Sequence, residues 1–130
     1  MRCFVRGDAK PKGSKRAFIV KNHAVLVDSS PDTKSWQYLV SETLTQEYHD
    51  APMCEPVEVT LLFYLHQPKT CPKRKWPYVK PDVDKLARTI LDALTGSVIV
   101  DDAQVISLTA EKRYGLIPGV EIEVHPLEVT

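Results

Sequence analysis

The chain lacks any long apolar segment. No stretch of its 130 residues approaches the roughly 20 apolar residues that a helix needs to cross a bilayer. Residues 1–6 carry two arginines and lack the apolar core of a signal peptide. Both absences argue against a secreted or membrane-embedded protein. We expect a cytoplasmic protein with no membrane partner.

Cysteine and histidine are too few and too scattered to indicate a zinc centre. The three cysteines form an odd number, and no pair of them has the spacing of zinc ligands. No histidine lies beside a carboxylate pair or beside a serine or cysteine that resembles a nucleophile. We expect reduced thiols and chemistry that needs neither residue type. These residues are Cys3, Cys54 and Cys71, with His23, His49, His66 and His125.

The chain has no excess of positive or negative charge, because 17 basic side chains balance 17 acidic ones. The distribution along the chain is nevertheless uneven. Residues 1–27 hold seven basic side chains and one acid, and residues 66–80 hold five basic side chains and no acid. Either segment alone is typical of a solvated surface. Together they bracket a group of carboxylates, which favours a polyanionic partner such as nucleic acid.

The apolar pattern predicts one domain over residues 1–130, of the α/β (α+β) class. Two helices are expected, one from Asp32 or Thr33 to about His49 and one over 83–95, and they pack on a mixed sheet in two layers. The apolar face of the first helix holds Trp36, Leu39, Val40, Thr43 and Leu44. Strands are expected at 2–7, 57–65, 104–114 and 119–125, with a hairpin over 17–20 and 24–27.

Four aspartates lie in two pairs, each at the boundary of an expected helix or strand. Pro81 keeps the preceding residue out of helical geometry, so the second helix begins after it. Asp82 then falls at the N-cap and Asp84 in the first turn, where the helix dipole helps to keep both ionised. Helix capping alone is an alternative explanation of this pair.

A second acidic pair, Asp101 and Asp102, follows an apolar run. Adjacent carboxylates repel each other, so the pair indicates either a turn or a bound cation. A strand that runs antiparallel to the helix could return this pair to the helix start. Our hypothesis is that Asp82, Asp84 and Asp102 converge to hold a hard cation such as Mg²⁺, which prefers carboxylate oxygens and leaves room for phosphate.

Residues 80–94 and 101–105 carry these aspartates in order and with a characteristic spacing. The two segments resemble the core signature of RusA-type Holliday-junction resolvases. Residues 10–16 and 111–115 also resemble the phage and prophage branch of that family. The resemblance implies a small, homodimeric, Mg²⁺-dependent endonuclease of bacterial or phage origin, with Mn²⁺ as a substitute metal. Such an enzyme resolves four-way DNA junctions by paired nicks in DNA recombination and repair.

The resemblance also implies residue roles. Asp82, Asp84 and Asp102 match the catalytic aspartates and metal ligands, and Asp101 is a further ligand candidate. Arg88 stands where the family has a functionally important lysine, so the positive charge is kept. Lys85 replaces the asparagine that usually follows the second aspartate, and it puts a competing cation near the metal.

The basic loops are expected to bind the DNA backbone. The candidate contacts are Lys12, Lys15, Arg16, Lys73, Arg74, Lys75, Lys112 and Arg113. Three alternatives remain open at the level of sequence. They are a non-catalytic DNA-binding module, a broader branched-DNA or flap nuclease, and a phosphatase or glycosyltransferase that uses the Asp-x-Asp pattern on a small phosphorylated substrate.

Overall fold

A computed structural model describes residues 1–13, 16–20, 23–27 and 31–127, with the backbone alone for 16–20 and 23–27. Its main sheet has four strands in the order β1-β6-β4-β5. Their bounds are Arg2–Arg6 (β1), Val57–Leu65 (β4), Val105–Tyr114 (β5) and Gly119–Pro126 (β6). The β4·β5 pair is parallel and the other two pairs are antiparallel, so the sheet is mixed.

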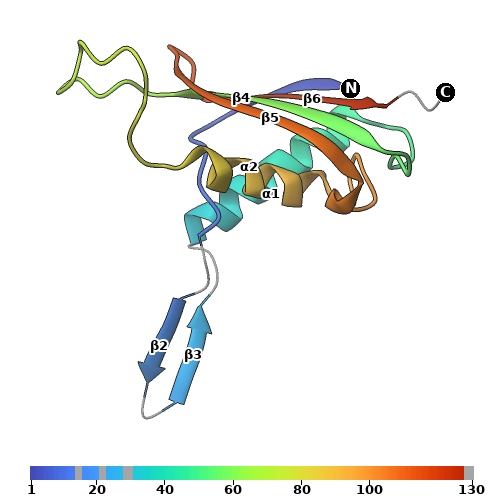
Figure 1. The fold of residues 1–130 in the computed structure, drawn as a ribbon, viewed down its shortest axis with the longest axis horizontal. Helices are drawn as coiled ribbons and strands as arrows, with labels where there is room; N and C mark the ends of the chain where they lie inside the picture. Colours follow the sequence, from blue (N-terminus) through green and yellow to red (C-terminus); the bar gives the residue numbers. More distant parts are fainter. Residues whose placement is uncertain (14–15, 21–22, 28–30, 128–130) are drawn as a thin grey trace.

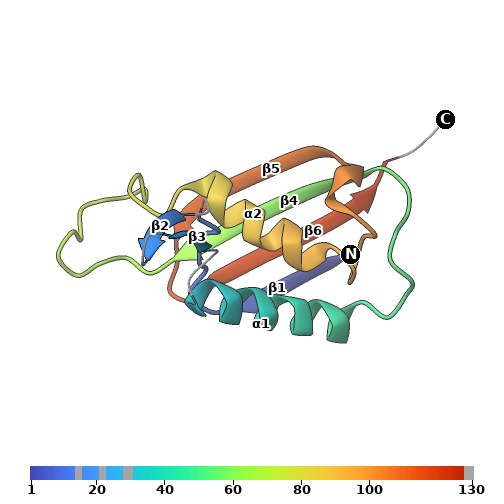
Figure 2. The same ribbon diagram turned by 90° about the horizontal axis from the view of Figure 1, so that it is seen from below.

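Two helices, α1 (Pro31–Glu47) and α2 (Val83–Leu94), lie on one face of this sheet. Figure 1 shows them as a second layer beneath the strands, and Figure 2, seen from below, shows them in front of the strands. The two-layer α+β fold expected from the sequence is confirmed, and each expected element is present within a few residues of its expected bounds. The hairpin forms as β2 (Arg16–Val20) and β3 (His23–Val27), which project away from the two layers (Figure 1). Among the described helices, none has the length and apolar character to cross a bilayer.

Alternation along the strands builds the core. Every second residue of β4 from Val57 to Phe63 is buried, because successive side chains point to opposite faces of a sheet. Helix α2 buries Leu86, Ile90 and Leu94 against these strands at the spacing of a helix face. Helix α1 buries Trp36, Val40 and Leu44. Leu39, expected on the same face, is instead 43% exposed because it lies at the flank of that stripe.

The segment between β1 and the hairpin is held against both helices. Thr33 of α1 donates its hydroxyl hydrogen to the carbonyl of Pro11 at 2.9 Å. Thr89 of α2 donates to the carbonyl of Lys10 at 3.0 Å. The amide of Lys12 donates to the carbonyl of Lys85 at 3.0 Å. This basic segment therefore lies along the surface of α2, which also carries the first aspartate pair.

Candidate active site

Asp82 occupies the N-cap position of α2, but its carboxylate does not cap the helix. Its backbone is extended (φ −70°, ψ 140°), and its side chain makes no cap hydrogen bond. The carboxylate lies instead 3.2 Å from the ammonium nitrogen of Lys85, one turn along the helix. Asp84 is exposed, and its carboxylate has no hydrogen bond or ion pair within the described part of the chain. Both carboxylates are therefore accessible at the positive end of the helix dipole.

The segment that leads into α2 is tied to the sheet by Lys112 of β5. The ammonium of Lys112 donates to the carbonyl of Val79 at 2.8 Å and to the carbonyl of Pro81 at 2.9 Å. Lys112 was expected from the sequence to contact DNA. In the structure two of its three N–H groups are directed at backbone carbonyls next to Asp82.

Asp101 and Asp102 form a tight turn at the other end of β5. Asp101 precedes the short 3₁₀ helix η1 (Asp102–Gln104), and the amide of Gln104 donates to its carbonyl at 3.1 Å. The side chain of Gln104 also stabilises this turn. Its amide oxygen accepts from the Asp101 N–H at 2.8 Å, and its nitrogen donates to the carbonyls of Met53 and Glu55 at 2.8 and 2.9 Å. Three of the four hydrogen-bonding positions of the Gln104 amide are thus used, namely both N–H donors and one acceptor position of the oxygen.

Carboxylates crowd around Asp102. Asp102 is exposed, but partial desolvation of its carboxyl group, followed by the neighbouring Asp101 and by Asp92, raises the pKa of Asp102 above its usual range. The pair Asp101 and Asp102 therefore forms a turn, which is one of the two explanations that the sequence left open. The same pair also concentrates negative charge, and a bound cation would reduce the repulsion.

The two aspartate pairs lie at opposite ends of α2. This helix has 12 residues, which corresponds to about 18 Å at 1.5 Å per residue. It runs antiparallel to β5, so its start lies beside the end of β5 and its last turn lies beside η1 (Figure 2). Within the described residues of one chain, no three acidic, histidine or cysteine side chains are close enough to hold a metal ion. The expected convergence of Asp82, Asp84 and Asp102 therefore does not occur within a single chain.

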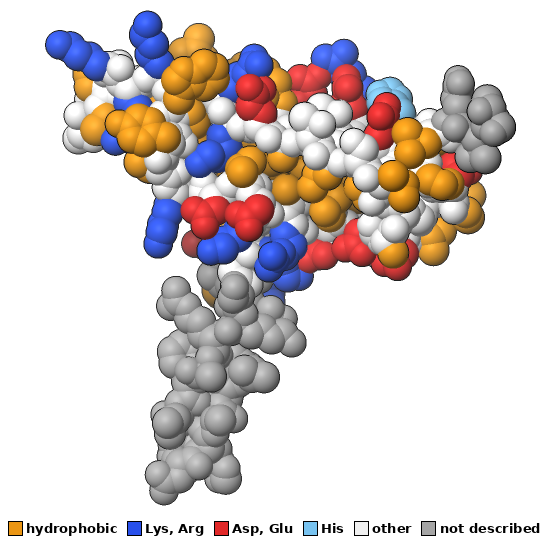
Figure 3. All heavy atoms as spheres, in the orientation of Figure 1, with side chains coloured by type: hydrophobic (Ala, Val, Ile, Leu, Met, Phe, Trp, Pro, Cys, Tyr) orange, Lys and Arg blue, Asp and Glu red, His pale blue; other side chains and the backbone are white. Residues whose placement is uncertain are grey.

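A polar stripe on α2 connects the two ends. Asp84, Arg88 and Asp92 follow one another at intervals of four residues, which places them on one face. Arg88 is exposed and makes no hydrogen bond or ion pair with other described residues. Asp92 is half-buried and forms an ion pair with Lys12, another residue expected to contact DNA. Figure 3 shows acidic side chains on the helix layer, with lysines and arginines gathered around those near the start of α2.

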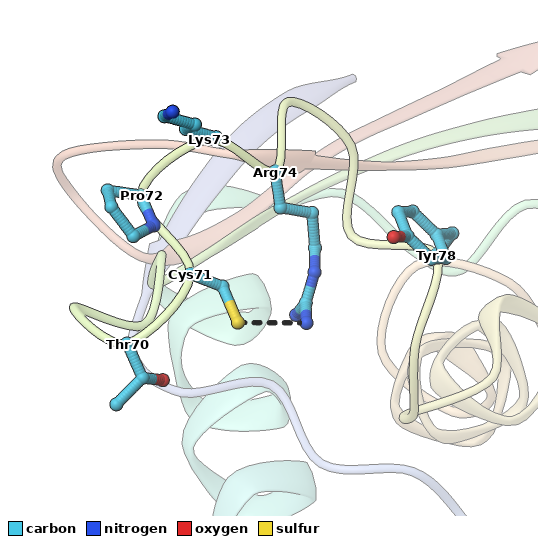
Figure 4. Close-up of a pocket in the computed structure, with 6 residues that line it drawn as sticks. All are labelled: Thr70, Cys71, Pro72, Lys73, Arg74 and Tyr78. Carbon is cyan, nitrogen blue, oxygen red and sulfur yellow. Dashed lines mark hydrogen bonds between the residues drawn. The ribbon is translucent and has the colours of Figure 1, made fainter.

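The basic loop over 66–81 has a defined internal structure. The Gln67 side chain donates to the carbonyls of Cys71, Pro72 and Arg74 at 3.4, 3.0 and 2.9 Å. The Arg74 guanidinium donates to the Tyr114 hydroxyl at 3.3 Å. It also donates to the Cys71 sulfur at 3.2 Å (Figure 4). It also lies 5.5 Å from the centre of a tyrosine ring, that of Tyr78.

A shallow hollow of about 490 Å³ opens between Thr70 and Tyr78, with Arg74 in its wall (Figure 4). Lys73 and Lys75 are exposed on the same loop. Contact of these three cations with a DNA backbone stays a prediction. Arg113 is half-exposed and pairs with Glu111 at 2.9 Å.

Two candidate DNA contacts fall on residues that are not fully described. Lys15 lies outside the described residues, and only the backbone of Arg16 is described, at the start of β2. Sequence reasoning assigned no role to Gln104 and did not foresee the backbone contacts of Lys112. A glutamine two positions after an aspartate pair is a usable signal, because it can close a capping box around the turn. Nothing local marks Lys112, whose partners are about 30 residues away.

Comparison with known proteins supports a single family. The family described as Endodeoxyribonuclease RusA matches residues 8–125. The chain is also 26% identical over 127 residues to the uncharacterized protein YqaN of Bacillus subtilis (strain 168), covering 89% of this chain and 86% of that protein. The family match includes both aspartate pairs, α2 and the basic loop. The chain belongs to the RusA endodeoxyribonuclease family.

Proposed function

We propose that this protein is a Mg²⁺-dependent endodeoxyribonuclease that nicks four-way DNA junctions during recombination and repair in the cytoplasm. One observation carries the proposal beyond family membership. Asp82 stands at the N-cap of α2 without capping it, so the capping explanation of this carboxylate does not hold. Asp82 and Asp84 instead present accessible oxygens beside a basic surface, where a DNA phosphate can approach.

The donor set fits magnesium. Mg²⁺ is commonly bound by one or two carboxylates together with water and phosphate oxygens. Asp82 and Asp84 provide such a pair at the start of α2, and Asp102 with Asp101 provides a second acidic group. A bound Mg²⁺ would supply an activated water and polarise the scissile phosphate.

The remaining residues serve binding and charge balance. Arg88 lies one helical turn after Asp84 and has no protein partner among the described residues, so its guanidinium is available to a phosphate oxygen. Such a contact would offset negative charge that develops on the phosphate in the transition state. Lys73, Arg74 and Lys75 would hold the DNA backbone outside the reacting phosphate.

A second copy of the chain resolves the separation of the aspartates. Strand β5 is an edge strand, and two of its apolar residues are exposed. Leu108, which pairs with the buried Val59 of β4, is 44% exposed, and Ile106, at the irregularity in the β4–β5 register, is 67% exposed. An unpaired edge with exposed apolar residues is suited to pairing with another strand. If two copies pair antiparallel along β5, Asp102 of one copy comes to the end where Lys112 of the other holds the start of α2. A two-fold dimer would also match the two-fold symmetry of a four-way junction.

Asp84→Asn tests the nuclease itself. The variant keeps the size and polarity of the side chain but removes the negative charge, so we expect a synthetic four-way junction to be bound normally and not nicked. The measurement is gel analysis of end-labelled junctions with and without Mg²⁺. Nicking by Asp84→Asn near the wild-type rate would refute the site. Mg²⁺-independent binding without nicking by the wild-type protein would favour a passive DNA-binding module, and equal cleavage of flaps would favour a broader branched-DNA nuclease.

Mixing two inactive variants tests the shared site. Asp84→Asn and Asp102→Asn subunits are each expected to be inactive alone. If each site combines Asp84 of one copy with Asp102 of the other, a mixed dimer contains one intact site. Random mixing in equal amounts then restores about a quarter of the wild-type sites, since half the dimers are mixed and each has one intact site of two. If all three aspartates act within one chain, mixing restores nothing.

A further inference from the structure

We propose that Lys112 is a positioning residue that sets the location of Asp82 and Asp84, and that it does not act as a DNA contact. The inference rests on the proposed nuclease function and adds to it a residue that family membership does not assign. It begins from the two hydrogen bonds that the ammonium donates to the carbonyls of Val79 and Pro81 at 2.8 and 2.9 Å.

The segment before α2 has little else to hold it. Among the described residues, the Lys112 side chain makes the only hydrogen bonds between residues 79–81 and the sheet. The side chains of Val79 and Lys80 are exposed, so packing contributes little. A loop without such an anchor has many accessible conformations and orders only at an entropic cost of about 1–2 kcal/mol per residue.

Lys112 itself is held firmly. It lies near the end of β5, where it pairs in register with the buried Phe63 of β4, and its own side chain is only partly exposed. Its two acceptors are the carbonyls of Val79 and Pro81, and Pro81 directly precedes Asp82. A displacement of Lys112 would therefore be transmitted through one peptide unit to the first carboxylate and through the first helical turn to the second.

Charge adds to this placement. The ammonium donates to the carbonyl of Pro81, the residue before Asp82, so it brings a positive charge to the backbone that leads into the aspartate pair. A charged donor also makes stronger hydrogen bonds to carbonyls than a neutral one. Two of its three N–H groups are directed at carbonyls. If the Lys112 ammonium moved to a DNA phosphate, it would have to break these two hydrogen bonds.

The experiment separates positioning from DNA contact through a split between rate and affinity. Lys112→Met removes the ammonium and keeps much of the apolar stem. We expect its single-turnover nicking rate at saturating junction to fall at least about tenfold, because small misplacements of catalytic groups are costly. The Kd for DNA and its salt dependence should remain within twofold of wild type. Lys112→Arg, which can also donate to two carbonyls, should recover most of the rate.

Lys34→Met is the matched control, since Lys34 is exposed on α1 and takes no part in the site. It should leave both rate and affinity unchanged. Two results would overturn the proposal. One is a wild-type single-turnover rate for Lys112→Met. The other is weaker DNA binding by Lys112→Met with a salt slope lower by about one, which identifies a phosphate contact.

Hydrogen exchange provides a readout that does not depend on nuclease activity. In Lys112→Met, amides of residues 79–86 should exchange faster while the free energy of global unfolding changes little. Unchanged exchange in this segment would also overturn the proposal. If the wild-type protein nicks no DNA at all, the proposed function fails, whereas the exchange result still decides whether Lys112 orders the start of α2.

Discussion

Lys12 and Asp92 form an ion pair across 80 positions of sequence, between the basic segment after β1 and the last turns of α2. Each side chain is less than one third exposed. The pair neutralises a carboxylate that would otherwise add to the repulsion around Asp102. Lys12 therefore has a structural partner within the chain, in addition to any contact that it makes with DNA.

A double-mutant cycle should reveal this pairing as coupling in the free energy of unfolding. We expect Lys12→Met to destabilise the protein by about 1 kcal/mol, because it leaves a half-buried carboxylate without its partner. In the presence of Asp92→Asn the same change should cost less, with a coupling energy of about 0.5–1 kcal/mol. Urea unfolding of the four proteins measures it. Additive effects within about 0.3 kcal/mol would show that the pair contributes nothing to stability.

Much of the fold could be predicted because its signals are local. The period-two pattern of β4 and the helical stripe of α2 each fix an element without help from the rest of the chain. Pro81 and Asp82 mark the start of α2 for the same local reason. The exposed position of Leu39 was missed because the width of a buried helix face depends on what packs against it, which the sequence of α1 does not contain.

The candidate site could be predicted only in part. Residue type and spacing make Asp82, Asp84 and Asp102 candidates, but they do not determine that a helix of about 18 Å separates them. That separation depends on the antiparallel arrangement of α2 and β5, a tertiary property. The partners of Lys112 and Lys12 are likewise distant in sequence, so a lysine expected to bind DNA can instead be bound by the protein itself.

Lys85 should weaken the metal site that it adjoins. Its ammonium lies 3.2 Å from the Asp82 carboxylate, where it competes with a cation for the same oxygen. We expect Lys85→Asn to lower the Mg²⁺ concentration for half-maximal nicking by up to about fivefold, the effect of an exposed pair worth at most about 1 kcal/mol. A magnesium titration of the nicking rate measures this. An unchanged requirement, or a higher one, would contradict the competition, and Lys34→Asn controls for the general loss of a positive charge.

Asp102 should make stability depend on pH in the metal-free protein. Its pKa is raised in the folded state, so the ionised carboxylate disfavours folding near neutral pH, and protonation relieves the cost as pH falls through that raised pKa. Asp102→Asn should therefore stabilise the protein near pH 7, by less than about 1 kcal/mol because the residue is exposed.

The gain from Asp102→Asn should shrink on acidification. Urea unfolding in EDTA from pH 7 to pH 4 measures it, and Asp8→Asn serves as the control for deleting an exposed carboxylate elsewhere. A stability gain that stays constant over this range would show that the Asp102 carboxylate is not under strain from its neighbours.

The basic loop over 66–81 offers three cations with different degrees of order. Lys73 and Lys75 are exposed, whereas Arg74 is held by Tyr114, Cys71 and the ring of Tyr78. An ordered guanidinium loses less conformational entropy when it binds a phosphate than a free lysine does. If this loop contacts the DNA backbone, replacing Arg74 should therefore weaken binding more than replacing either lysine.

This ranking can be measured on a nicking-deficient background. With Asp84→Asn present, fluorescence anisotropy of a labelled junction gives Kd as a function of salt. Each of Lys73→Ala and Lys75→Ala should lower the slope of log K against log salt by about 0.9, the value for one lost phosphate contact on duplex DNA. Arg74→Ala should lower the slope by the same amount and weaken binding further. Arg74→Lys should restore the slope but not the full affinity, because the ammonium lacks the planar fork that Tyr114 and Cys71 orient. Equal losses for all three alanine variants would show that the order of Arg74 is irrelevant to binding, and unchanged slopes would place the DNA elsewhere on the protein.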